Sequence, residues 1–70
     1  MKSLVIDMLR KEAEAQKAKG LLTLELLTKY PAGIGDHSTK DYYGNANEAL
    51  TMIVDADDKL EALDKYFGTE

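Results

Sequence analysis

The stretch that decides the fold is Tyr30-Pro31-Ala32-Gly33-Ile34-Gly35-Asp36-His37-Ser38. It divides the chain into two proline-free segments. Pro31 is the only proline among the 70 residues, and a proline pushes the residue before it out of the helical region. The two glycines supply turn chemistry, and Asp36 and Ser38 are residue types that cap helix N-termini. The stretch therefore predicts a connection of about six residues between two antiparallel helices.

The segment before this turn, residues 4–30, predicts a helix whose apolar residues fall into two stripes. It is rich in Leu, Ala, Lys and Glu, all strong helix formers, and Ser3 is placed to cap it. Alternation over residues 22–26 permits a short strand, but the flanking leucine pairs favour helix. We interpret Gly20 as permitting close approach of another helix. The first stripe holds Ile6, Leu9, Ala13, Gly20, Leu24 and Leu27; the second stripe holds Leu4, Met8, Ala15, Leu22 and Leu26; the polar face that separates the two stripes on the far side holds Asp7, Arg10, Lys11, Glu14, Glu25 and Lys29.

The segment after the turn, residues 39–67, carries an unbroken heptad seam that predicts a coiled-coil-like helix ending near Gly68. We expect Tyr43, Leu50 and Val54 to widen the seam. Residues 44–47 disfavour a helix interior, so the helix either kinks or restarts there; the unbroken register favours continuity. The seam residues are Tyr42, Ala46, Ala49, Ile53, Ala56, Leu60, Leu63 and Phe67.

These patterns predict an all-α fold, a single antiparallel two-helix hairpin over residues 1–70 with helices at about 4–30 and 39–67. A domain this small buries too little surface for a large core, and it usually needs a staple. The chain has no cysteine and a single histidine, which leaves oligomerisation as the staple. Because one partner helix covers one stripe, we expect homo-oligomerisation into a helical bundle to cover the other.

The charge balance excludes some classes of partner. The net charge of −4 argues against direct nucleic-acid binding, which needs clustered Lys and Arg, and against an anionic membrane surface. No signal peptide or membrane-spanning run is present in the sequence, so we expect a cytoplasmic protein. The acidity is compatible with a basic protein partner.

The turn and the start of the second helix form the best candidate ligand site. Glycine backbone amides near a helix N-terminus suit a phosphate or carboxylate, and a lysine and a histidine add charge and donors. The opposing interpretation is that turn geometry and capping alone explain these residues, and it is the one that we favour. The candidate residues for an anionic or nucleotide-like ligand are Gly33, Gly35, His37, Ser38, Lys40 and Tyr43.

Catalysis and metal binding are poorly supported, so we predict no enzyme, no cofactor and no metal site. No nucleophile motif surrounds His37 that would make it a general base. Asp57, Glu61 and Asp64 share one helical face, as acidic ligands do in helical nucleotide hydrolases, but lysines interleave with them. Mixed charge beside a heptad seam is typical of a solvated face.

The turn motif Gly33-Ile34-Gly35-Asp36-His37 and the later segment from Asp58 to Phe67 resemble small accessory proteins of tailed phages, especially those of marine cyanobacteria. The resemblance covers roughly residues 21–67, and it departs at residues 38–47, where relatives often have proline after the histidine. It implies a phage accessory context with no assigned activity.

Three functional classes follow, in order of preference. The first is a non-enzymatic module that binds a host component, with ligand capture at the 33–40 loop of an oligomer as one version. The second is a structural or virion-associated helical protein. The third, which the interleaved lysines disfavour, is a metal-dependent nucleotide hydrolase.

Overall fold

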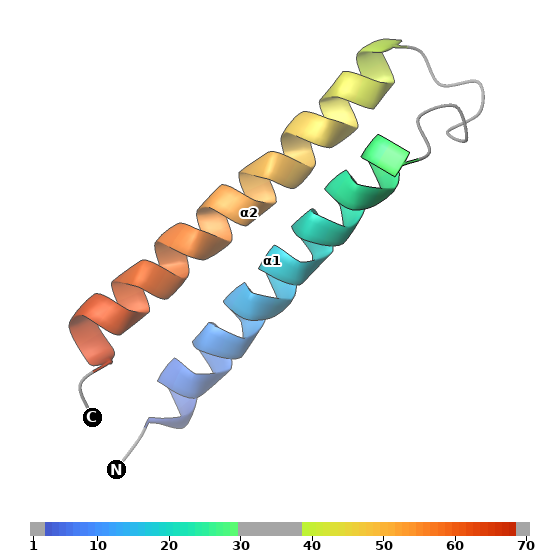
Figure 1. Cartoon of the computed structure of the whole chain (residues 1–70). Coiled ribbons are helices and arrows are strands. Elements are labelled where there is room, and N and C mark those ends of the chain that lie inside the picture. Colours follow the sequence, from blue (N-terminus) through green and yellow to red (C-terminus); the bar gives the residue numbers. More distant parts are fainter. Residues whose placement is uncertain (1–2, 30–38, 69–70) are drawn as a thin grey trace.

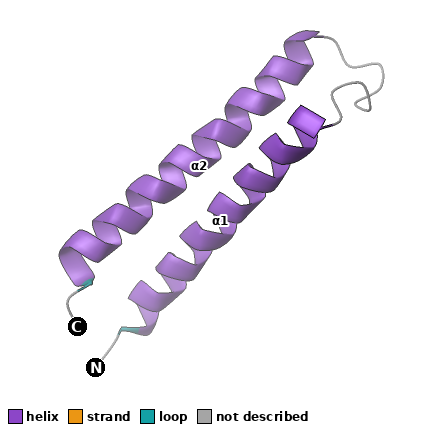
Figure 2. Cartoon of the chain, in the orientation of Figure 1, coloured by secondary structure: helices purple, strands orange, loops and turns teal. Residues whose placement is uncertain are grey.

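Two antiparallel helices make up the part of the protein that the structure describes. The computed structural model describes residues 3–29 and 39–68, apart from the side chains of residues 39 and 40. Helix α1 spans Leu4–Lys29 and α2 spans Thr39–Phe67, and the two pack side by side along a body of 52 × 16 × 14 Å (Figure 1). Figure 2 shows that all the described regular structure is helical. The predicted all-α hairpin is confirmed; the connecting turn, with Tyr30 and Ser38, lies outside the described residues.

Ser3 caps α1, as its sequence position predicts. Its hydroxyl oxygen accepts a hydrogen bond from the Ile6 amide at 3.4 Å, and its carbonyl accepts one from the Asp7 amide at 3.1 Å. These contacts satisfy amides of the first turn, which have no intrahelical partner. The negative charge of Asp7 in that turn also complements the helix dipole.

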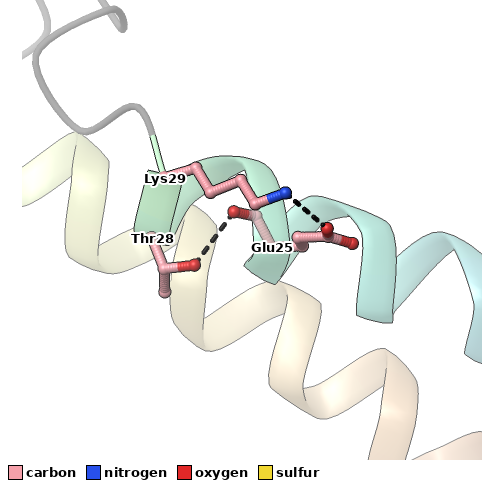
Figure 3. A network of polar contacts seen from close by, with 3 residues as sticks. All are labelled: Glu25, Thr28 and Lys29. Carbon is pink, nitrogen blue, oxygen red and sulfur yellow. Dashed lines mark hydrogen bonds and ion pairs between the residues drawn. The ribbon is translucent and has the colours of Figure 1, made fainter.

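Side chains at the other end of α1 bond within the last turns (Figure 3). The Thr28 hydroxyl donates to the Glu25 carbonyl at 2.9 Å, and the Lys29 ammonium lies 3.0 Å from a Glu25 carboxylate oxygen. A glutamate four residues before a lysine is the favourable order for such a pair, and a cation suits the C-terminal end of the dipole. The helix therefore keeps regular geometry up to Lys29.

The contact between the helices is lined by small residues at heptad spacing. Ala13, Gly20 and Leu27 are the buried residues of α1, and Ala49, Ala56 and Leu63 are those of α2. The first stripe and the predicted seam thus face each other, and α2 runs without interruption through residues 44–47. Two details of the seam prediction are wrong. Phe67 is 49% exposed at the end of the hairpin, and the residues expected to widen the seam are exposed instead: Tyr43 67%, Leu50 50% and Val54 48%.

Gly20 lies where α1 and α2 pack closely against each other. A Cβ atom built there would lie 2.7 Å from Cγ1 of Ile53 and 2.9 Å from the carbonyl oxygen of Ala49. Real Cβ atoms do not tolerate such distances, so only glycine fits while α2 keeps its place. The interpretation of Gly20 as a point of close helix packing is confirmed.

Polar contacts fix how the helices face each other. The Tyr42 hydroxyl donates to the Leu27 carbonyl at 3.0 Å, and the Gln16 amide donates to the Met52 carbonyl at 3.0 Å. On one edge of the contact, Arg10 pairs with Asp64, and Lys17 Nζ lies 2.8 Å from Asp57 Oδ1.

Arg10, which was assigned to the polar face between the two stripes, is at the edge of that face next to α2. It lies beside the contact, and its long side chain reaches across to α2. The pairing with Asp64 was not predicted, and it forms because an arginine next to the contact can reach the other helix.

Candidate functional site

The predicted turn site is largely beyond the described residues. Gly33, Gly35, His37 and Ser38 lie outside them, and Lys40 is placed only as backbone in the first turn of α2. Tyr43 is the sixth candidate; its ring is 67% exposed and packs edge-on against Tyr42, with centroids 5.8 Å apart. Anion capture at this turn stays a prediction.

The acidic face of α2 is occupied by ion pairs. Asp57 binds Lys17 and Asp64 binds Arg10, so two of the three carboxylates considered for a metal neutralise cations of α1. Within residues 3–29 and 39–68, no group of three His, Cys, Asp or Glu side chains gathers closely enough to hold a metal ion. The described part of the chain thus offers its exposed surfaces, rather than a reactive cluster, as candidate sites.

Exposed apolar side chains are the dominant feature of the surface. Only five apolar residues are buried in the described part of the chain, and three of them are alanines. The large apolar side chains that remain exposed are Leu4, Val5, Met8, Leu9, Leu21, Leu22, Leu26, Tyr43, Leu50, Val54, Tyr66 and Phe67.

The second stripe of α1 supplies a large share of this exposed apolar surface. Leu4 is 85% exposed, Met8 53%, Leu22 56% and Leu26 49%, and Ala15 is exposed as well. The prediction that α2 leaves this stripe uncovered is confirmed. A continuous apolar stripe on a helix is typical of a face that packs against another element.

The total area is consistent with a protomer of a larger assembly. A monomeric protein of 7.8 kDa is expected to expose about 4,400 Å², whereas this chain exposes 5548 Å². The surplus of about 1,100 Å² reflects the elongated body as well as the uncovered apolar side chains.

The two helices differ sharply in charge. Helix α1 carries four acidic and five basic residues, whereas α2 carries seven acidic and three basic residues. On α2 the exposed Leu50 and Val54 lie four residues apart and therefore side by side on the helix surface. Asp58 and Glu61 follow within two turns. The α2 surface thus combines a short apolar strip with strong negative charge.

A hollow of about 370 Å³ opens between the helices at the end away from the turn. Leu9, Ala13, Leu63 and Phe67 contribute apolar walls, and Glu12 and Lys59 bring charge to it. The volume is within the range of small-molecule pockets. Sequence reasoning missed this hollow, although the alanines at 13 and 62 leave room that a larger residue would fill.

Comparison with known proteins adds no identity: no family model, no curated protein and no solved structure matches the chain. Neither of the described helices combines the length and the apolarity needed to cross a membrane.

Proposed function

We propose that this protein is a non-enzymatic helical binding module that works as a homo-oligomer. The observation that carries this proposal is the imbalance between five buried apolar residues and twelve exposed large ones in the described part of the chain. Covering the second stripe removes apolar surface from water, which is the main driving force of protein association. The contact between the helices buries little apolar surface, because three of its five buried apolar residues are alanines.

Self-association is expected to be visible in solution. At micromolar concentration the protein is expected to sediment as an assembly of at least two chains, because the apolar second stripe of α1 stays exposed in the single chain. Analytical ultracentrifugation over a dilution series measures this directly. A folded species with the mass of one chain across the whole series would contradict the proposal.

The assembled module acts, in this proposal, by docking a basic protein of a host cell on the outward surface of α2. Two features support this partner. The net charge of the chain is concentrated on α2, and opposite charge speeds and orients association. Leu50 and Val54 add exposed apolar area within the acidic surface, which suits an amphipathic helix. The resemblance to small phage accessory proteins supports a host component as the target.

Leu50→Asp is expected to abolish this docking without disturbing the assembly. The substitution places a charge in the apolar strip that the partner helix covers, whereas α1 keeps its second stripe. The matched control is Thr51→Asp, which adds the same charge at the neighbouring exposed position. Affinity capture from a cyanobacterial lysate, with retained proteins identified by mass spectrometry, measures the difference.

The expected result is a basic protein that the wild type and the Thr51→Asp variant retain, that high salt releases, and that Leu50→Asp does not retain. Equal retention by both variants would place the docking surface elsewhere. Circular dichroism on each variant verifies that the helices are intact.

A further inference from the structure

The residues of the second stripe, and those of the line beside it, follow a pattern that is nearly the same from either end of α1. Met8, Ala15 and Leu22 form its central line at heptad spacing. Each follows by two residues a position of the line 6, 13 and 20 that faces α2, and two residues turn a helix by about 200°. The central line therefore lies on the side of α1 opposite α2, consistent with its exposure. Reversal about Ala15 exchanges Met8 with Leu22, one apolar side chain with another.

The line beside it shows the same symmetry with charge included. Val5, Glu12, Lys19 and Leu26 also recur at heptad spacing. Reversal of this line about the point midway between Ala15 and Gln16, half a residue from the centre of the first line, exchanges Val5 with Leu26, which are 60% and 49% exposed, and exchanges Glu12 with Lys19. Apolar residues thus meet apolar residues at the ends, and an acid meets a base on each side of the middle.

Glu12 and Lys19 have no ion-pair partner within residues 3–29 and 39–68 of their own chain. An antiparallel second copy would supply one for each, twice by symmetry, because the same patch meets itself in a two-fold interface. A parallel copy in register would instead oppose Glu12 with Glu12 and Lys19 with Lys19. The charges therefore select the antiparallel arrangement.

We infer that two copies of this chain dock through α1, antiparallel and centred on Ala15, with Glu12 of each opposite Lys19 of the other. The inference rests on the proposed self-association and specifies its surface. Small residues at the centre, Ala15 and Ala18, permit close approach of the helices, as Gly20 and Ala49 do within the protomer. The arrangement places α1 inside the assembly and leaves the acidic α2 on its outside.

Charge reversal tests the inference. Glu12→Lys alone and Lys19→Glu alone each place like charges opposite one another at two symmetric positions, and both are expected to raise the dissociation constant of the assembly at least tenfold. The double variant Glu12→Lys/Lys19→Glu restores both pairs and is expected to assemble like the wild type. Glu14→Lys, an equal charge change on a different face of α1, is the control and is expected to assemble normally.

Mixing the two single variants gives the sharpest result. Lysines at 12 and 19 of one chain then oppose glutamates at 19 and 12 of the other, so a mixed assembly is expected where neither variant assembles alone. Analytical ultracentrifugation measures assembly, and circular dichroism measures helix content before and after mixing. If folding depends on assembly, mixing is expected to recover both signals together.

Two results overturn the inference, and they are distinct from failure of the proposed function. If the wild type assembles but the single variants assemble as tightly, the interface lies on another surface and self-association stands. If the single variants dissociate but neither mixing nor the double variant restores assembly, the antiparallel pairing is wrong. A wild type that remains a single chain removes the inference together with the proposal on which it rests.

Discussion

Gly20→Leu is expected to lower the free energy of unfolding by about 3 kcal/mol or more and to separate the helices at the middle of the hairpin. Even the first atom of a side chain at this position would lie 2.7 Å from Ile53 Cγ1 and 2.9 Å from the Ala49 carbonyl oxygen. The isoleucine end can turn aside, but the carbonyl belongs to the backbone of α2 and moves only with the helix. Urea denaturation followed by circular dichroism, at matched protein concentration, measures the loss.

Alanine at the same position separates packing from helix propensity. Glycine costs about 1 kcal/mol relative to alanine inside a helix, so propensity alone would make Gly20→Ala stabilising. We expect it to be destabilising, because displacing the backbone of α2 costs more free energy than the higher helix propensity of alanine contributes. Gly44→Ala is the control, since a Cβ atom there meets nothing within 4 Å, and it is expected to add about 1 kcal/mol. Stabilisation by both alanines would show that the helices are farther apart at Gly20.

Leu27→Ala is the second change with a large expected effect. Leu27 is 8% exposed and is one of only two large apolar side chains that the described chain buries well. Truncating such a leucine costs about 2–5 kcal/mol through lost burial and the cavity left behind. The side chain also lies where Tyr42 bonds the Leu27 carbonyl at 3.0 Å, so the cavity would loosen that end of the contact.

Leu21→Ala is the matched control for this second prediction. The two leucines are on the same helix, so the change in propensity is the same, but Leu21 is 51% exposed. It also lies away from the stripe assigned to the second copy, so truncation is expected to cost less than about 1 kcal/mol. Thermal and urea unfolding of both variants measure the contrast. Equal losses would mean that Leu21 is covered in the assembled protein.

The sequence was sufficient to predict the helices and their faces. Ser3, the heptad seam from Tyr42 to Leu63 and the second stripe of α1 all have the roles that capping and periodicity predict. Periodicity predicts which face of a helix is apolar, and in a hairpin the face that turns inward has only the other helix as its partner. The existence of the fold therefore follows from local pattern alone.

The pairing of particular residues could not be predicted in the same way. That Gly20 meets Ala49, and that Lys17 meets Asp57, depends on the register between helices, which a repeat of seven residues leaves ambiguous by whole heptads. The trio Tyr43, Leu50 and Val54 was misplaced because it lies on the outward surface of α2. The ion pair of Arg10 was missed because that residue lies at the boundary between the contact and solvent. There the reach of a side chain, and how close the backbones come, decide its environment.

The candidate functional surfaces likewise include features that the sequence predicts and features that it does not. The exposed second stripe was predicted because it is periodic, whereas the hollow beside Leu9 and Phe67 arises from the fit of two particular faces. The turn residues 33–38 follow no such repeat, and their predicted role depends on backbone geometry that residue types do not specify.

The small residues in the contact between α1 and α2 also determine how the protein responds to temperature. The heat capacity of unfolding comes mainly from apolar surface newly exposed to water, and Ala13, Gly20, Ala49 and Ala56 contribute little of it. A separate hairpin would therefore have a flat stability curve. Most of the curvature of the stability curve would come from covering Met8 and Leu22 in the assembly. Cooling would therefore weaken the contact between chains before it weakens the contact between α1 and α2.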